Sequence, residues 1–335
     1  MARVTIKDVA RCAGVGVATV DRVLNSRAAV APETAARVLA AAEALGFHAV
    51  RLLRARLETA PLTLGFVRQS RHDAFYAALG GGLAAAAQAR HIRAVVEHVE
   101  DLTPGHIAAR LRTLKTRARA VGLVAAEHPL ISAAVEEMQA AGVPVFCLLS
   151  DLSTPARAGF IGVDPRRRGR TAGWAVSRLA AQPGPVGIML GSPRYLEHEM
   201  CEISFRSYLR EHAPAFRVLE PLINMEDAHL AREGVAAMLR RHPDLAAIYA
   251  TCGGVSGIME ALREHPRGRD IVAVCNELVP AHRQGLIDGT LDVVLDTPLD
   301  MLTARAVDAM AAAVAGEMYE SRIVLPFVLY GAEMV

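Results

Sequence analysis

The chain has 335 residues, of which 52% are hydrophobic, and a formal net charge of +2. This length is enough for two or three domains with substantial cores. The charge is unevenly distributed, because residues 1–60 hold nine Arg or Lys against five acids and are +4, while the remainder is −2. A small basic segment on a faintly acidic chain is typical of nucleic-acid binding at one end only.

The five cysteines argue against small cross-linked folds. They are scattered, odd in number and include no CxxC pair, which is not the pattern of a disulfide scaffold or a zinc ribbon and is compatible with a reducing cytoplasm. The amino terminus is polar and cationic, and no apolar run reaches membrane-spanning length. We therefore expect a cytoplasmic protein with no membrane partner, no metal and no cofactor.

Residues 4–25, VTIKDVARCAGVGVATVDRVLN, predict two short helices joined by a tight turn. Thr5 and Asp8 have the spacing of a capping box, and Gly14 stands where a helix ends in a left-handed residue. Val20 and Val23 form the inward pair of the second helix. The stretch predicts a helix-turn-helix, with a helical hairpin of an unrelated α domain as the alternative.

The outer side of the second helix is suited to the major groove, because a recognition helix presents its first residues to base edges. Arg22 can read guanine O6 and N7, while Val17 and Ala18 can contact a thymine methyl. Thr19 and Asn25 are suited to phosphate contacts, which set the register without reading the sequence.

TIKDVARCAGVGVATVDRVLN, followed by VAPETAARVLAAAEALGF, resembles the DNA-binding headpiece of the lactose-repressor (LacI-type) family of transcription regulators. The resemblance runs without a gap. It implies base reading by Val17, Ala18 and Arg22, and phosphate contact by Thr19 and Asn25. Family members usually carry serine where this chain has Gly16, Asp21 and Ala31. A carboxylate at position 21 would repel phosphate and narrow the choice of operator.

A third helix is predicted from Pro32, which suits a first helical turn, to a stop at Gly46, with Phe47 filling the core of the three helices. The resemblance then implies a hinge helix that folds on DNA and inserts a leucine into the minor groove. The expected wedge position holds Arg56, so Leu53 or Leu57 would insert instead.

The arginines around these leucines would contact the adjacent phosphates; they are Arg51, Arg54 and Arg56. A basic linker helix that never enters the groove is the alternative. We place the headpiece at residues 1–48, the hinge helix and linker at 49–60, and an effector-binding and dimerisation domain at 61–335.

From residue 62 onward, short apolar runs such as LTLGFV, VPVFCLL and DIVAVCN alternate with alanine-rich helical stretches. Strands alternating with helices imply parallel sheets with helices on both faces. The rhythm repeats after about Gly184, which indicates two similar lobes, and SRIVLPFVLYG is expected to be a late strand that crosses back. The resemblance implies a two-lobed, periplasmic-binding-protein-like effector domain.

Polar residues that follow these strands are candidate ligand contacts, because ligands bind beyond the carboxyl ends of parallel strands. An aromatic ring on a sugar face with a carboxylate on its hydroxyls makes a good polyol site. The candidates are Asp73, Phe75, Tyr76, Asp151, Arg194, His198, Glu199, Thr251, Asn276, Glu277 and Asp296. Helix capping or a surface salt bridge is the alternative for each of them.

Two further features bear on the ligand. An arginine that family members often place after Arg194 aligns with Cys201, which argues against an effector carboxylate held from that side. The run of Arg166, Arg167, Arg168 and Arg170 opens a helix and is interpreted as a solvated face.

Together these features predict an allosteric transcription regulator, a repressor that binds pseudo-palindromic operator DNA as a homodimer or a tetramer. A sugar, sugar acid or polyol between the lobes would control its DNA affinity, and a nucleobase also fits. A solute-binding receptor and an α/β enzyme are the alternatives. The sequence shows no nucleophile elbow, metal cluster or pair of catalytic carboxylates, so an enzyme is not expected.

Overall fold

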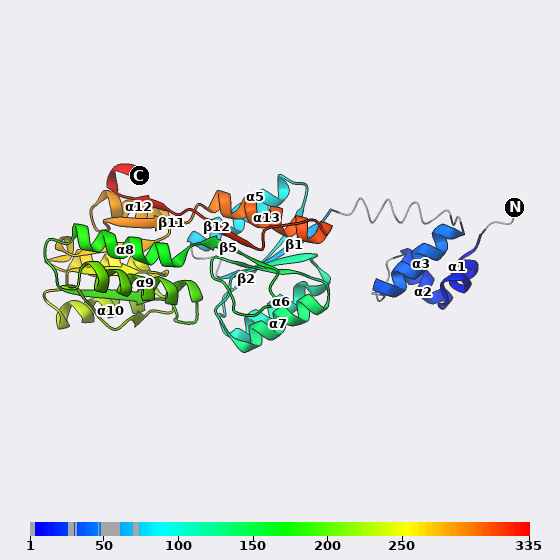
Figure 1. The fold of residues 1–335 in the computed structure, drawn as a ribbon, viewed down its shortest axis with the longest axis horizontal. Coiled ribbons are helices and arrows are strands. Elements are labelled where there is room, and N and C mark those ends of the chain that lie inside the picture. The colour runs from blue at the N-terminus through cyan, green and yellow to red at the C-terminus, as the bar shows by residue number, and fades with distance from the viewer. Residues whose placement is uncertain (1–3, 26–29, 31, 46, 48–60, 70–73) are drawn as a thin grey trace. The chain divides into compact units, whose positions relative to one another are not determined.

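The computed structural model describes residues 4–25, 30, 32–45, 47, 61–69 and 74–335 (Figure 1). The chain forms two compact units, Met1–Pro61 and Leu62–Val335. The predicted hinge at residues 49–60 lies outside the described residues and stays a prediction. None of the described helices is long and apolar enough to cross a membrane.

The first unit contains the predicted helix pair followed by a third helix. Its helices are α1 (Ile6–Ala13), α2 (Val17–Asn25) and α3 (Pro32–Ala44). The Thr5 backbone N–H donates to Asp8 Oδ2 over 2.9 Å, and Gly14 ends α1 with a φ of 63°. The predicted cap and stop of the first helix are therefore confirmed.

The core of this unit is small and made of short side chains. Val9, Val20 and Val38 are fully buried, one from each helix, and Phe47 packs against them as expected. An Arg37 Nη2 group donates to the Ala13 carbonyl over 3.0 Å, which ties α3 to the end of α1. Because Val20 of α2 lies in this core, the opposite side of α2 faces away from it.

The first lobe of the second unit is a parallel six-stranded sheet, ordered β12-β5-β4-β3-β1-β2. Its strands are β1 (Thr63–Gln69), β2 (Arg93–Val99), β3 (Ala120–Leu123), β4 (Val145–Leu148), β5 (Gly159–Val163) and β12 (Arg322–Leu325). The helices α5 (Ala74–Gln88) and α13 (Leu299–Ala315) cover one face, and α6 (Pro104–Thr113) and α7 (Pro129–Ala140) cover the other (Figure 1).

The second lobe repeats this plan with a seven-stranded sheet, ordered β13-β11-β10-β9-β6-β7, in which β8 also pairs with β6. Its strands are β6 (Pro185–Leu190), β7 (Arg217–Val218), β8 (Leu222–Ile223), β9 (Ala247–Ala250), β10 (Val272–Asn276), β11 (Val293–Asp296) and β13 (Val328–Tyr330). Only β13 is antiparallel to its neighbour among the described pairs. The predicted repeat of two parallel α/β lobes is confirmed.

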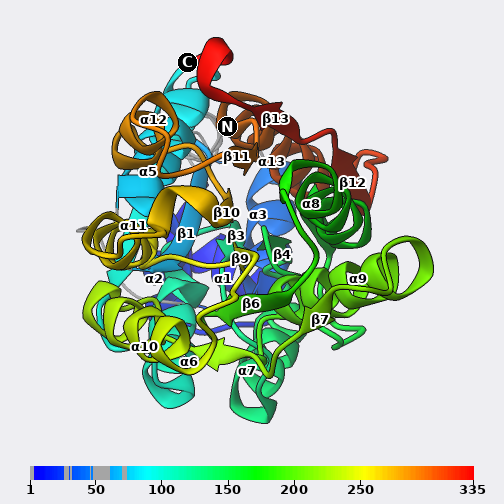
Figure 2. The ribbon, with the colours of Figure 1, turned by 90° about the vertical axis from the view of Figure 1, so that its left-hand side faces the viewer.

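Two helices pack on one face of this second sheet and three on the other (Figure 2). The first pair is α8 (Pro165–Leu179) and α9 (Leu196–His212). The opposite face carries α10 (Ala228–Arg241), α11 (Val255–Glu264) and α12 (Pro280–Ile287).

The chain passes between the lobes three times: from β5 into α8, from β11 into α13, and from β12 into β13. The last passage is the predicted crossing strand, which forms two strands rather than one. Pro326, which has no N–H to donate to a ladder, stands between them. The carboxyl ends of parallel strands from both lobes border the region between the lobes.

Close packing of α8 on α9 depends on Gly169. A Cβ at this position would lie 2.2 Å from the Cys201 carbonyl oxygen, whereas one at Gly81 on α5 would meet nothing within 4 Å. We expect Gly169→Ala to lower the free energy of unfolding by about 1–3 kcal/mol through overpacking. Gly81→Ala should raise it by about 0.5–1 kcal/mol through helix propensity.

Urea unfolding followed by circular dichroism measures both effects. Equal effects of the two substitutions would show that the α8–α9 contact is looser than described.

Candidate functional site

The second helix of the first unit presents an exposed outer side. Val17 is 46% exposed, Ala18 and Arg22 are also exposed, and Thr19 is half-buried. Because Val20 faces the core, these residues form the accessible surface of α2. The other predicted DNA contacts lie outside what the structure describes: the side chain of Asn25, and Arg51, Leu53, Arg54, Arg56 and Leu57.

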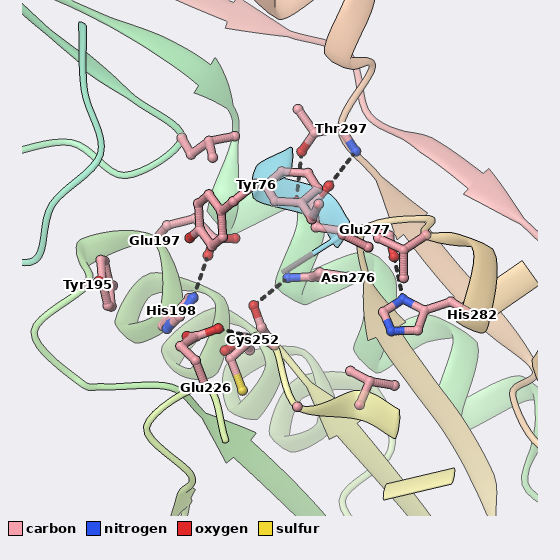
Figure 3. Close-up of a pocket in the computed structure, with 18 of the residues that line it drawn as sticks. Tyr76, Tyr195, Glu197, His198, Glu226, Cys252, Asn276, Glu277, His282 and Thr297 are labelled. Atoms are coloured by element: carbon pink, nitrogen blue, oxygen red, sulfur yellow. Dashed lines mark hydrogen bonds and ion pairs between the residues drawn. The ribbon is translucent and has the colours of Figure 1, made fainter. Parts of the chain in front are cut away.

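A cavity of about 250 Å³ lies between the two lobes of the second unit (Figure 3). The first lobe contributes Phe75 and Tyr76 from α5 and Leu149 and Ser150 after β4. The rings of Phe75 and Tyr76 meet edge-on with centroids 5.4 Å apart. The polar lining side chains of the second lobe are Arg168, Tyr195, Glu197, His198, Glu226, Thr251, Ser256, Asn276, Glu277, His282 and Thr297.

The structure brings together six of the candidate ligand contacts named from the sequence. Phe75, Tyr76, His198, Thr251, Asn276 and Glu277 all line the cavity. Asp73 lies outside the described residues. The remaining four, Asp151, Arg194, Glu199 and Asp296, are not among the described lining residues.

Three of these four have other contacts. The Asp151 carboxylate accepts from Arg157 and Arg322 at 3.1 Å each, which ties together the surface of the first lobe. The Arg194 carbonyl accepts from the Glu127 N–H at 2.7 Å, a backbone hydrogen bond between the lobes. Asp296 accepts from the Leu278 N–H at 2.7 Å. These contacts are structural, and Glu199 points to solvent from α9.

Arg168 corrects the interpretation of the arginine run. Arg166 and Arg167 are exposed, but the Arg168 side chain is only 2% exposed and borders the cavity. Its position in the helix repeats at the buried residues Ala172 and Val176, so the helical period places it inward. The prediction of a solvated face is therefore wrong for this one residue.

The buried Arg168 guanidinium is held by partners from three other segments. Its Nη1 donates to Glu277 Oε1 over 2.9 Å and to Glu197 Oε1 over 3.3 Å, and its Nη2 donates to Thr297 Oγ1 over 2.6 Å. Burial by itself lowers the pKa of Arg168, but the two carboxylates raise it by more. The guanidinium stays charged because it is paired.

Glu277 is used on both of its carboxylate oxygens. Besides Arg168, it accepts from the Thr297 N–H over 3.0 Å and from the Thr297 hydroxyl over 2.9 Å. Its φ of 67° lies in the left-handed region, which non-glycine residues adopt at a cost that the surrounding bonds must offset. The hydrogen bonds to Thr297 fix this conformation at the carboxyl end of β10.

Glu226 is carried into the cavity by an unusual loop after β8. Met225 and Glu226 have consecutive positive φ values of 52° and 65°. The Glu226 carboxylate accepts from the Gly253 N–H over 2.6 Å. A Cβ on Gly191 or Gly253 would lie 1.7 or 2.5 Å from a carboxylate oxygen, so both glycines make room for it.

Direct hydrogen bonds join the lobes at the cavity rim. The Gln69 side-chain amide donates to the Tyr195 hydroxyl, and the Glu197 N–H donates to Ser150 Oγ over 3.4 Å. Burial, and then the negative charge of Glu226, raise the pKa of Tyr195 above its ordinary range. The phenol therefore stays protonated at the rim.

Sequence reasoning missed the carboxylates of Glu197 and Glu226. Glu197 lies on the same helix as the predicted His198, and its Oε2 atom lies 3.5 Å from His198 Nε2. Glu197 lies one helical turn before Cys201, which is buried. The helical period was therefore the signal that could have placed Glu197 on the inner side of the helix. Glu226 follows β8, a strand of only two residues. The pattern of apolar runs did not separate β8 from the strand before it, β7, so the loop that carries Glu226 was not predicted.

Comparison with known proteins gives matches to two family models. Residues 64–318 match the periplasmic binding protein domain, and residues 5–49 match the bacterial regulatory proteins of the lacI family. The two matches fall in the two compact units of the chain.

Curated relatives resemble only part of the chain. It is 45% identical over 76 residues to the HTH-type transcriptional regulator GalS of Salmonella typhimurium, and 39% identical over 80 residues to catabolite control protein A of Priestia megaterium. These alignments cover 23% and 24% of this chain, and they span 22% and 24% of the two relatives. The chain therefore matches about a quarter of the length of these relatives.

A solved structure resembles the rest. An ABC transporter solute binding protein from Agrobacterium vitis, bound with alpha-D-tagatopyranose, superposes with a TM-score of 0.76 at 19% identity. The superposition covers 81% of this chain and 95% of that chain. At this identity the likeness shows the fold.

Asp296 makes the stability of the protein depend on pH. Burial raises its pKa from 3.8 to about 6, against the opposing hydrogen bond from Leu278. The folded state then binds more protons than the unfolded state between these values, so this contribution to stability falls as the pH rises from about 4 to 6. Above pH 6 the buried charge destabilises the fold.

We expect Asp296→Asn to stabilise the protein more at about pH 8 than at about pH 4.5. The matched control is Asp300→Asn, which removes an exposed carboxylate at the start of α13. Urea unfolding at both pH values gives the difference. An equal effect of Asp296→Asn at the two pH values would contradict the raised pKa.

Proposed function

The chain belongs to the periplasmic binding protein domain family over residues 64–318 and carries a lacI-family regulatory domain at residues 5–49, and on this premise we propose that it is a ligand-controlled, DNA-binding transcription regulator. The observation that carries the proposal is the joint presence of an exposed recognition helix and an interlobe cavity in one chain. A regulator needs both, because a signal must reach a DNA-binding surface.

The DNA contacts lie on α2. Its exposed Val17, Ala18 and Arg22 would read base edges in the major groove. Thr19 and Asn25 would contact phosphates and set the register. A homodimer, or a tetramer of two such dimers, would place two headpieces on a pseudo-palindromic operator. Because operator DNA is reachable only from the compartment that holds it, the proposal places the protein in the cytoplasm.

The effector occupies the cavity between the lobes. Phe75 and Tyr76 offer aromatic faces, and Thr251, Asn276 and the carboxylates offer hydrogen bonds to hydroxyl groups. The cavity of about 250 Å³ lies below the usual range for drug-sized ligands and suits a small molecule. A carbohydrate-like effector is further supported by the tagatose bound to the structural relative.

Ligand control would act through the angle between the lobes. A ligand that binds one lobe arrangement better shifts the protein toward it, with a coupling of typically about 1–3 kcal/mol. The predicted hinge helix at residues 49–60 would transmit this change, with Leu53 or Leu57 inserted into the minor groove and Arg51, Arg54 and Arg56 on phosphates. In this proposal the protein represses transcription when it is bound to its operator.

A solute-binding receptor is the second candidate, and the likeness of the second unit to solute binding proteins favours it. A receptor has no use for the lacI-family domain at residues 5–49, so the regulator accounts for more of the chain. Selection of DNA from a random duplex library by the full chain separates the two. A regulator enriches a two-fold symmetric site, and a receptor enriches none.

Arg22 should supply sequence preference on the selected site. We expect Arg22→Ala to weaken binding there by about 1–3 kcal/mol and to relax preference at one base pair in each half-site. Arg11→Ala is the matched control, because it removes the same charge from an exposed side chain on α1. Fluorescence anisotropy on selected and random DNA measures both variants. Equal losses on the two DNAs for Arg22→Ala would make Arg22 a phosphate contact.

A further inference from the structure

One side of the second unit carries an exposed surface that runs across both lobes, with α8 in the second lobe and β12 in the first (Figure 2). A groove of about 530 Å³ lies between the two elements. It is lined by the start of α8, with Thr171, and by the crossing segment, with Val324 and Phe327. The two elements therefore lie side by side at the middle of this surface. We call it the α8–β12 surface and define it as the exposed side chains of residues 164–178 and 317–327.

The second-lobe half of the α8–β12 surface is basic and centred on the one tryptophan of the chain. Trp174 is 44% exposed, with Arg167 and Arg170 before it and Arg178 after it in the helix. Residues three, four and seven apart share one face of a helix, so the three arginines surround the indole. Arg170 is also paired with Glu211 over 2.9 Å. The outer side of α8 therefore offers an apolar ring with positive charge around it.

The first-lobe half carries an acidic turn between α13 and β12. Met318 in this turn is fully exposed, and the exposed Glu317 and Glu320 stand on either side of it, with Tyr319. Glu320 is also paired with Arg305 over 3.1 Å. The turn itself contains two glutamates and no basic residue. It offers an apolar side chain with negative charge around it, the converse of the surface at Trp174.

The two halves match each other across a two-fold axis through the groove. Trp174 lies ten residues after Asp164, which is about 15 Å along the axis of α8, away from the groove. The four residues of β12 place the turn with Met318 at least about 13 Å from the groove in the first lobe. In a two-fold contact, residue i of one copy meets residue j of the other, and j meets i. A half-turn therefore brings the basic half of each copy to the acidic half of the other.

We infer that the α8–β12 surface is a contact between two copies of this chain, in which Trp174 and Arg178 of each copy meet Met318 and Glu317 of the other. The contact goes beyond the proposed function, because it depends on neither DNA nor effector, and it would join two chains or two dimers of the regulator. Tryptophan and methionine are enriched in protein interfaces, and sulfur packs favourably on aromatic rings. Opposite charges around them fix the register of the contact.

An extended peptide that adds a strand to β12 is the other occupant that such a sheet edge could take. β12 has only four residues, and Pro326, which has no N–H to donate, follows it. Arg322 at its start is held by Asp151 over 3.1 Å. Short length, charge and proline are the features that protect an edge from strand addition. Side-chain contacts between two copies are therefore favoured over an added strand.

Sedimentation equilibrium of the full chain over a concentration series tests the contact. We expect the wild type to form an assembly and Trp174→Glu to halve its mass. The substitution should weaken association by about thirtyfold or more, because a buried tryptophan is a typical interface hot spot. Leu130→Glu is the matched control, since Leu130 is similarly exposed on α7 and lies outside the α8–β12 surface. It should leave the assembly intact.

Two charge reversals test the pairing itself. Arg178→Glu and Glu317→Arg each set like charges against one another at both contacts, so each should weaken association by about tenfold. When the two variants are mixed, the mixed pair has opposite charges at both contacts. A label on the Arg178→Glu chain should therefore enter the assembly in this mixture. It should enter poorly when the second chain is Glu136→Arg, which changes an exposed glutamate on α7.

A full chain that keeps the mass of one copy throughout the series overturns the inference, as does an assembly that Trp174→Glu and both reversals leave intact. Equal entry of the label in the two mixtures also overturns it, and the mixtures decide even if Trp174→Glu does not fold. The DNA selection is read separately. An enriched symmetric site with an unaffected assembly refutes this contact alone, and a sensitive assembly without an enriched site refutes the regulator alone.

Discussion

The buried guanidinium of Arg168 joins several segments of the second lobe that line the cavity. Arg168 comes from α8, and its partners Glu197, Glu277 and Thr297 come from α9, the end of β10 and the end of β11. A charge this deeply buried is tolerated only when it is paired and hydrogen-bonded. The hydrogen bonds of this one side chain therefore join the helix pair to the two strand ends, in addition to the apolar packing between the helices and the sheet.

This cluster lies close to the chain passages between the lobes. Arg168 is one helical turn from Asp164, the cap of α8 at the first passage, and Thr297 stands at the second. Glu197 also donates its N–H to Ser150 of the first lobe. A change in the charge or contacts of the cavity thus acts directly on the segments that set the lobe angle. This proximity gives the proposed ligand control a physical route within the second unit.

The sequence predicted the local features well because each depends on neighbouring residues. The cap of α1, its stop at Gly14 and the alternation of strands and helices follow from spacing alone. The inward position of Arg168 was also readable from the helical period, but its charge favoured the surface interpretation. Glu226 was not readable, because consecutive left-handed residues and the space left by two distant glycines arise from tertiary packing. The ends of strands indicated the right edge of each sheet, but not which side chains turn into the cavity.

The measurement that tests the organising role of Arg168 most directly is the unfolding free energy of Arg168→Met beside Arg167→Met. The two positions are adjacent on α8, but the Arg167 side chain is 82% exposed and the Arg168 side chain 2%. Removing Arg168 leaves two carboxylates buried without their cation, so a loss of about 3–5 kcal/mol is predicted. Arg167→Met should change stability by no more than about 0.5 kcal/mol. Equal, small effects of both substitutions would contradict the account.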